Sequence, residues 1–489
     1  MAKMAGPAAA DSDPIGKELD ECKELLIDIP LALEPPLWPE CCIYRVPKRL
    51  REINEKAYTP RLVSIGPFHH RREELRNMEM QKLRYLRDFC YRTRTSHEDL
   101  AANIQRSEVK IRRCYSETFE LSSEEFVKMI LLDAVFIIEP FLRKSEILTE
   151  HKDHILHQPC MERGIRSDLI LLENQLPFFV LENLFTLVPK PQVSSGCKNH
   201  KEGQQTEELK EGLSKNVFSS SFRDLSCQFF ESYGKPPESS SIREVKHFTD
   251  LVRNFFFPPT KLTPNSPPPN QRVSESRSSI QCLYTATKLG EAALKFRPAR
   301  ERSLLEITFP ENKCLENCPC FNLSWLISCL PCLKTTFLAK MQRFLEVPPF
   351  LVDDKTEGLF RNLMALEQCH YPSQTFICDY VVLLDNLITT KKDVSLLVEK
   401  KVIANELGSN AAVTDLINKL GLEIEENATF YSELTRKLNG YYENPWNRLV
   451  ATLTSVYFHD FWRGTATVIG LVVLALTMWN FIRLVSRSR

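Results

Sequence analysis

The amino-acid sequence predicts a mainly α-helical soluble body with a minor β ribbon and one C-terminal transmembrane helix. Three observations support this fold class. Glycine is scarce, with 15 residues against 30 prolines in 489, which favours helices ended by proline over a meandering sheet. Apolar residues recur at helical spacing in several long segments. Near the C-terminus, 19 consecutive residues carry no charge, which is about the length of one helical bilayer crossing.

The uncharged segment runs from Gly464 to Ile482 and predicts a membrane span. Trp462 and Trp479 lie near its ends, where amphipathic aromatic side chains favour the interface. The alternative is a buried C-terminal helix. The basic tail favours a cytoplasmic C-terminus with the body outside, at the plasma membrane. A tail of this length also suits post-translational insertion as an endomembrane tail anchor, with the body in the cytosol.

Composition divides the chain into six segments. Residues 258–279 hold six prolines and five serines, so they predict a linker or exposed loop. The predicted organisation is an N-terminal tail and short helix at 1–40, a first helical region at 41–257, the linker at 258–279, a second helical region with the β ribbon at 280–463, the span at 464–482 and a basic tail at 483–489.

Helical patterns and two short strand patterns fill the two regions. The segment "SSEEFVKMILLDAVFIIEPFLR" is apolar from Met129 to Ile138 apart from Asp133, so it predicts a buried helix. Asp133 itself is either a perturbed acid or a satisfied structural carboxylate. The segments "SLLEITF" and "RFLEVPPFLVDD" predict short strands, paired as the ribbon.

The segment "DLILLENQLPFFVLENLF", residues 168–185, combines large apolar residues with an acid–amide cluster. It is too polar for a membrane span. We expect a helix over 168–174, a polar elbow, and a second helix with Pro177 in its first turn. Glu173, Asn174 and Gln175 would then satisfy loose backbone groups at the elbow. The alternative is a ligand site.

The sequence contains no G-x-x-x-x-G-K-[ST], G-x-G-x-x-G, G-x-S-x-G or H-E-x-x-H motif. The best catalytic candidates are His69 and His70, with Glu73 and Glu74 nearby. Adjacent residues rarely aim both side chains at one point. We therefore expect these histidines to hydrogen-bond the following helix, with a metal or acid–base site as the alternative.

Five of the 16 cysteines fall within residues 314–332, as "CLENCPC" and "CLPC". This spacing resembles halves of a thiolate cluster, but it lacks two clean C-x-x-C knuckles. Metal ligation, disulfides and reduced thiols in an apolar loop are all open. We expect reduced thiols and no metal.

Charge is balanced overall, with 63 basic and 63 acidic residues, which gives no global attraction to nucleic acid. Residues 41–115 nevertheless hold 18 Lys and Arg against 9 Asp and Glu. Such a face suits an anionic leaflet or an acidic partner, or it is a solvated helix surface with internal ion pairs.

Six strings in order resemble the plant domain of unknown function 247 family: "CCIYRVPKRLREINEKAYTPRLVSIGPFHH", "NMEMQKLRYL", "MILLDAVFIIEPFLR", "DLILLENQLPFFVLENLF", "FRNLMALEQC" and "RLVATLTSVYFHDFW". The resemblance covers about residues 41–482. Family members often have a glycine after the His-His pair, where this chain has Arg71. The resemblance implies a mostly helical, largely uncharacterised plant membrane protein. Some grass members are linked to pollen-side self-incompatibility recognition. No enzyme activity, cofactor or catalytic residue comes with the family.

The predicted function is recognition or signalling through protein–protein contacts by a single-pass, membrane-anchored plant protein. We expect no enzyme activity and no cofactor. The expected partners are an unknown protein and, through the C-terminal helix, the lipid bilayer, but not nucleic acid. The alternatives are a membrane-tethered enzyme that uses His69, His70 or the Glu173 elbow, and an adaptor at an organelle surface.

Overall fold

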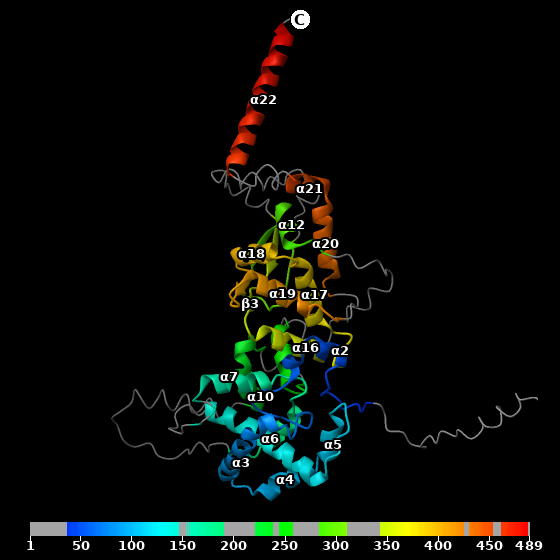
Figure 1. Cartoon of the computed structure of the whole chain (residues 1–489), viewed down its shortest axis with the longest axis vertical. Coiled ribbons are helices and arrows are strands. Elements are labelled where there is room, and N and C mark those ends of the chain that lie inside the picture. Colours follow the sequence, from blue (N-terminus) through cyan, green and yellow to red (C-terminus); the bar gives the residue numbers. More distant parts are fainter. Residues whose placement is uncertain are drawn as a thin grey trace, which may run out of the picture. The chain divides into compact units, whose positions relative to one another are not determined.

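The computed structural model describes residues 37–145, 153, 155, 157–189, 221–237, 244–257, 283–310, 343–424, 430–452 and 461–487. Residues Glu40–Arg489 form one compact unit. In its described part, helices predominate and two small sheets complete the fold (Figure 1). The prediction of a mainly helical body is therefore confirmed.

In the first part of the chain, residues 37–257, the regular elements that the structure describes are all helices. Its elements are α2 (Lys48–Ile53), η2 (Glu55–Tyr58), η3 (Glu73–Met78), α3 (Glu79–Thr93), α4 (His97–Gln105), α5 (Glu108–Arg113), α6 (Ser123–Ser145), α7 (Pro159–Asp168), α8 (Phe178–Phe185), α10 (Phe222–Phe230), η4 (Glu231–Tyr233), α11 (Phe248–Arg253) and η5 (Asn254–Phe256).

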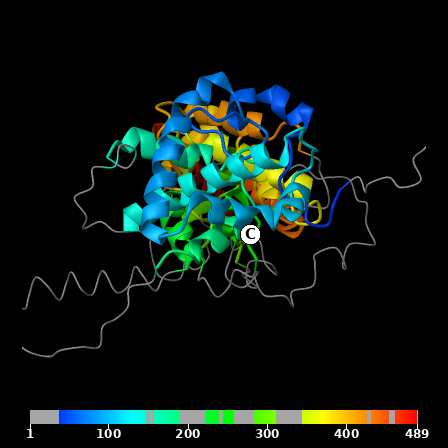
Figure 2. The same cartoon turned by 90° about the horizontal axis from the view of Figure 1, so that it is seen from below.

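Helix α6 is the buried centre of this part. It begins where the Ser122 hydroxyl accepts a hydrogen bond from the Glu125 N–H at 3.2 Å, and Glu124 in its first turn suits the positive end of the helix dipole. Nearly every residue from Phe126 to Leu142 is buried. Helices α3, α4, α8 and α10 all contact it. Figure 2, which views the molecule from below, shows the early helices packed together in this part of the chain. The predicted buried helix is confirmed.

The second part of the chain contains both sheets. Its elements are α12 (Ala286–Glu291), β1 (Lys295–Pro298), β2 (Phe344–Val347), β3 (Phe350–Val352), α16 (Thr356–His370), α17 (Phe376–Leu387), α18 (Lys391–Glu399), β4 (Ile403–Asn405), α19 (Asn410–Leu420), α20 (Ser432–Glu443), α21 (Pro445–Thr452) and α22 (Phe461–Arg487).

The predicted β ribbon is confirmed in part, since its two segments meet at one bridge, but the strands take other partners. Strand β2 pairs in parallel with β1, and β3 pairs in parallel with β4. The segment "SLLEITF" contributes an isolated antiparallel bridge, from Thr308 to Glu346. Pro348 and Pro349 separate β2 from β3. Because proline has no N–H to donate, the strand pairing stops there and each half takes a different partner.

Helix α16 ties the two parts together. Asn362 accepts a hydrogen bond from the Leu172 N–H at 2.9 Å and donates one to the Ala57 carbonyl at 2.7 Å. Five residues further along the helix, Glu367 forms a buried ion pair with Arg253 at 2.9 Å. One hydrophobic cluster extends over both parts, from Cys42 to Leu438. The second part therefore completes the interior of the first.

The predicted transmembrane helix at Gly464–Ile482 is wrong. These residues do lie in a helix, α22. Within the part of the chain that the structure describes, however, no helix combines the length and apolarity that a bilayer crossing needs. A span requires about 20 predominantly apolar residues. The predicted location at a membrane stays a prediction.

Candidate functional site

The polar elbow lies between α7 and α8. Helix α7 ends at Asp168, so the helix predicted over 168–174 is wrong, and α8 begins after Pro177. The Gln175 amide group donates to the carbonyls of Leu169 at 2.6 Å and Leu171 at 2.8 Å. Its oxygen accepts from the Phe248 N–H at 3.0 Å. Gln175 thus bonds carbonyls that follow the end of α7 and an N–H group at the start of α11.

Asn174 and Asp168 hold a second chain segment against the elbow. The Asn174 side chain accepts from the Ile65 N–H at 2.7 Å and donates to the Val63 carbonyl at 3.0 Å. The Asp168 carboxylate accepts from the N–H groups of residues 61–63 at 2.7–3.1 Å. These contacts satisfy the backbone of a buried segment that has no ladder partner. They position Ser64 and the residues that follow it.

Glu173 is the charged centre of the elbow and is almost fully buried. One carboxylate oxygen accepts from the Val46 N–H at 2.7 Å and forms an ion pair with Arg51. The other lies 3.3 Å from His69 Nε2 and 3.7 Å from an Arg45 nitrogen. The elbow therefore joins α2 and the His69 loop through one carboxylate.

The protonation states follow from burial and from these partners. Burial on its own would raise the pKa of Glu173, but His69 and Arg51 beside its carboxylate outweigh burial and lower the pKa below its ordinary value. Burial lowers the pKa of His69, although Glu173 opposes that shift. At neutral pH the cluster contains an ionised glutamate held by arginine and a neutral histidine. Glu173 is engaged by the Val46 N–H and Arg51, whereas neither ring nitrogen of His69 makes a hydrogen bond among the described residues.

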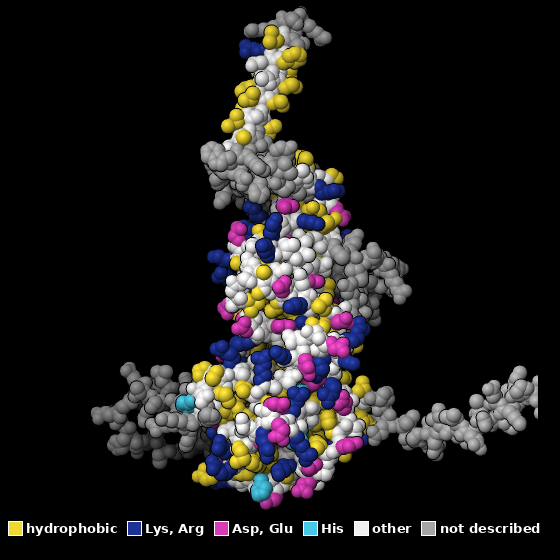
Figure 3. All heavy atoms as spheres, in the orientation of Figure 1, with side chains coloured by type: hydrophobic (Ala, Val, Ile, Leu, Met, Phe, Trp, Pro, Cys, Tyr) yellow, Lys and Arg dark blue, Asp and Glu magenta, His cyan; other side chains and the backbone are white. Residues whose placement is uncertain are grey.

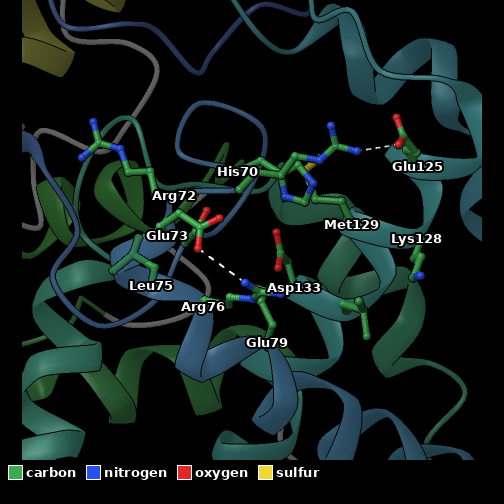
Figure 4. Close-up of a pocket in the computed structure, with 13 residues that line it drawn as sticks. His70, Arg72, Glu73, Leu75, Arg76, Glu79, Glu125, Lys128, Met129 and Asp133 are labelled. Carbon is green, nitrogen blue, oxygen red and sulfur yellow. Dashed lines mark hydrogen bonds and ion pairs between the residues drawn. The ribbon is translucent and has the colours of Figure 1, made fainter.

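His70 points away from this cluster and lines a pocket of about 610 Å³. Figure 4 shows Asp133 in the middle of this pocket, between the charged side chains of the 71–79 segment and those of α6. The pocket is lined by Ser64, His70, Arg71, Arg72, Glu73, Leu75, Arg76, Glu79, Glu125, Lys128, Met129, Leu132 and Asp133. The structure thus separates His69 and His70, which the sequence could only treat as a pair.

Asp133, which lines the pocket, belongs to a buried ion pair. Lys82 Nζ lies 2.6 Å from Asp133, 2.6 Å from Glu79 and 2.7 Å from the Ser64 carbonyl. The second Asp133 oxygen accepts from the Gly66 N–H at 2.8 Å. Burial raises the pKa of Asp133 to about 6, against the opposing charge of Lys82. Burial would lower the pKa of Lys82, but Asp133 and Glu79 outweigh it and raise that pKa.

The pocket brings together Ser64, His70 and Asp133, the residue types of a hydrolase relay. Their geometry does not support that chemistry. Both Asp133 oxygens are engaged, by Lys82 and by Gly66, and among the described residues no hydrogen bond connects the three side chains. The Ser64 hydroxyl is buried without a hydrogen-bond partner in the described part of the chain.

Arg71, which follows the two histidines, has a φ of 65°. This left-handed conformation costs a non-glycine residue roughly 1–2 kcal/mol. The Arg71 side chain forms an exposed ion pair with Glu125 at 2.5 Å, across the mouth of the pocket. A glycine here, as the family resemblance implies for many members, would remove both the strain and the ion pair.

Sequence reasoning missed Lys82, which connects the pocket floor to α3. The signal was present in the spacing, because Met78, Lys82, Tyr85 and Phe89 share the buried face of this segment. A lysine on such a face needs a buried acid, and Asp133 was the acid available. The cysteine-rich segment 314–332 lies outside the described residues. Among the residues the structure does describe, no group of side chains suits a metal ion.

Fold and site define a mainly helical protein built around a buried polar elbow, with a charged pocket beside it. The chain belongs to the plant domain of unknown function 247 family, whose model, described as a plant protein of unknown function, matches residues 43–476. The resemblance noted in the sequence is thereby confirmed.

Two curated proteins of Arabidopsis thaliana are similar over nearly their whole length. UPF0481 protein At3g47200 is 27% identical over 473 residues, covering 92% of this chain and 87% of the relative. Putative UPF0481 protein At3g02645 is 23% identical over 532 residues, covering 91% of this chain and 90% of the relative. No solved structure matches this chain.

Proposed function

We propose that the protein acts by recognising another protein, through the outward face of α3 and the adjoining pocket. One observation carries this proposal. Met80, Leu83 and Tyr91 expose 59%, 44% and 89% of their surface on α3. Arg84 and Arg87 are exposed between them. We call these five residues the α3 stripe.

The composition of the α3 stripe is that of a binding surface. Tyrosine, methionine and arginine are enriched at the centres of protein interfaces, where they supply large contact areas. Their positions recur at intervals of three or four residues, so they share one face of the helix. Figure 3 shows hydrophobic and basic side chains next to one another at the end of the molecule that carries α3.

The charge of the surface supports an acidic partner, although Arg87 and Arg76 also form exposed ion pairs with Asp88 and Glu73. Arg84 and Arg87 lie on the stripe, and Arg76 stands at the pocket mouth beside the start of α3. An acidic partner surface with an apolar strip would complement this arrangement. Such an association weakens with added salt, because the arginines are exposed and their charges are screened.

The alternative function, an enzyme that uses His69, His70 or Glu173, has less support. His69 and Glu173 are buried, and Glu173 is engaged by the Val46 N–H and Arg51. His70 is the histidine that reaches a pocket. A His70→Ala variant that keeps partner binding and stability but abolishes the biological response would favour the enzyme.

The test combines Met80→Ser, Leu83→Ser and Tyr91→Ala in one full-length variant. Proximity labelling in plant tissue first identifies proteins enriched around the wild type. Binding is then measured with the purified candidate partner over a range of salt concentrations. We expect affinity to fall at least tenfold, because truncating a central interface residue commonly costs about 2 kcal/mol or more.

The matched control is Leu422→Ser, since Leu422 is also half exposed but lies after α19. This variant should bind like the wild type. Equal binding by the α3 stripe variant, or equal losses in both variants, would refute the stripe as the contact surface. Binding that does not respond to salt would refute the acidic partner.

A further inference from the structure

We propose that Cys42 and Cys114 form a disulfide, a covalent modification site that fastens the start of the folded body to the end of α5. The backbone already holds the two residues side by side. The N–H groups of Cys42 and Ile43 both donate to the Cys114 carbonyl at 2.9 Å, and Ser116 donates to the Ile43 carbonyl at 2.9 Å. Ile43 and Tyr115 form a parallel bridge.

This geometry suits the span of a disulfide. Paired strands lie about 4.8 Å apart, which is inside the range of Cα separations, roughly 4.4–6.8 Å, that a disulfide bridges without backbone movement. Both residues are free thiols in the structure, and the Cys114 thiol donates a hydrogen bond to the Lys110 carbonyl at 3.3 Å.

The surroundings of the pair favour a stable bond once it has formed. Both cysteines are buried, in the same hydrophobic cluster as Ile43 and Tyr115. Solvent-borne reductants reach a buried disulfide slowly. The nearest competitor in sequence is Cys41, which is also buried. The segment that contains Cys41 has a contact of its own, which does not involve Cys114: the Cys41 carbonyl accepts a hydrogen bond from the Tyr44 hydroxyl.

The chemistry requires an oxidant, for which we name a disulfide of the glutathione type. The interaction with Cys42 lowers the pKa of the Cys114 thiol, so Cys114 is the first to attack. Its thiolate displaces one thiol from the oxidant and forms a mixed disulfide. The Cys42 thiolate then attacks the Cys114 sulfur and displaces the second thiol. Two protein thiols lose two electrons and two protons, and the oxidant becomes two thiols.

The bond would close residues 42–114 into a loop. That loop contains the 61–66 segment held by the elbow, the pocket residues from Ser64 to Glu79, and all of α3. Closing a long loop restricts the unfolded chain and so stabilises the folded one. The α3 stripe would then be held in a chain segment fastened at both ends. The inference does not depend on the function proposed for that stripe.

The test is a redox titration of the reduced full-length chain. The protein is equilibrated in glutathione buffers that contain sub-denaturing urea, which lets buried segments open. It is then quenched in acid, alkylated and digested with trypsin. We expect a cross-link between the peptide with Cys42 and the peptide beginning at Cys114, lost on reduction. Because Cys41 and Cys42 share a peptide, the titration is repeated on Cys41→Ser, which should keep the cross-link, and on Cys42→Ser, which should lose it.

Buried Cys227 on α10 provides the control, since glutathione adducts at this position prove that the reagent reaches the interior. The oxidised wild type should also melt at a higher temperature than its reduced form, with no such difference for Cys42→Ser. Separate glutathione adducts at Cys42 and Cys114, or free thiols at both while Cys227 reacts, would overturn the proposal. So would a cross-link that survives in Cys42→Ser and disappears in Cys41→Ser.

Discussion

Gln175 shows how one side chain stabilises the elbow. It satisfies two carbonyls and one N–H, all buried. We expect Gln175→Leu to lower the free energy of unfolding by about 2–4 kcal/mol, because each buried group left unpaired costs roughly 1–3 kcal/mol and the elbow can relax only in part. Urea unfolding followed by circular dichroism measures the loss. Gln105→Leu, at an exposed position of α4, is the control, and equal midpoints for the two variants would contradict a structural role.

The Lys82–Asp133 pair allows a prediction about the stability of a buried ion pair. Removing one partner leaves a charge buried, which typically costs about 3–5 kcal/mol. Lys82→Met alone should therefore be strongly destabilising, although Asp133, with a pKa of about 6, escapes part of that cost by taking up a proton. The double variant Lys82→Met, Asp133→Leu should recover a large part of the loss. A double-mutant cycle measured by urea unfolding tests the coupling, and strictly additive losses would show that the two residues act independently.

At the scale of elements, α11 contains a pH-sensitive cap. His247 Nδ1 accepts from the Asp250 N–H at 3.4 Å, and Nε2 lies 3.0 Å from the Cys42 carbonyl, so the neutral ring with a proton on Nε2 satisfies both contacts. Burial lowers the pKa of His247 to about 4. The unfolded chain, in which a histidine has a pKa of about 6.5, therefore binds the proton first as pH falls.

The direction in which pH changes the free energy of unfolding follows from that difference in pKa. Stability that is present above pH 6.5 is lost as pH falls toward 4, at up to about 1.4 kcal/mol per pH unit. We expect His247→Asn, which keeps a side-chain oxygen for the cap, to lack this contribution. The measurement is the difference between the two stability profiles from pH 7 to 4, in which other titrating groups cancel. A difference that does not change with pH would show that His247 is not the group responsible.

Local sequence patterns predicted some elements and not others. Helix α6 was predictable because its apolar run, its N-terminal serine and its acidic first turn all lie within one segment. The residues after Asp168 were predicted as helix from the same kind of run, yet they form turns. Their polar groups bond instead to Ile65 and Phe248, partners that no local pattern reveals. The two parallel sheets were missed for the same reason, since β1 and β4 are far in sequence from their partners.

At the scale of the whole molecule, α16 makes the two parts depend on each other. Without it, the Leu172 N–H, the Ala57 carbonyl and Arg253 lose buried partners. These losses, at roughly 1–3 kcal/mol for each hydrogen bond and more for the ion pair, are comparable with the total stability of an ordinary protein, about 5–15 kcal/mol. We expect a fragment of residues 40–257 to show no cooperative thermal transition.

The fragment is compared with the full-length chain. The folded part of the full-length chain should unfold in a single transition, measured by circular dichroism and calorimetry. Hydrogen exchange provides a second measurement, because amides of α6 should be protected in the full chain and not in the fragment. Protected α6 amides in the fragment would mean that the first part folds alone.

The contacts of Asn362 also have a consequence for the order in which the protein is made. Leu172 and Asn362 are 190 residues apart, so at a synthesis rate of roughly 5–20 residues per second the ribosome needs about 10–40 s to deliver the partner. Throughout that interval the Leu172 N–H of the elbow has no hydrogen-bond partner, and the early helices lack the contacts that α16 provides. Cys42 and Cys114, by contrast, have both left the ribosome long before α16. Pauses in translation between these points would lengthen the time for which the nascent first half can associate wrongly with other chains.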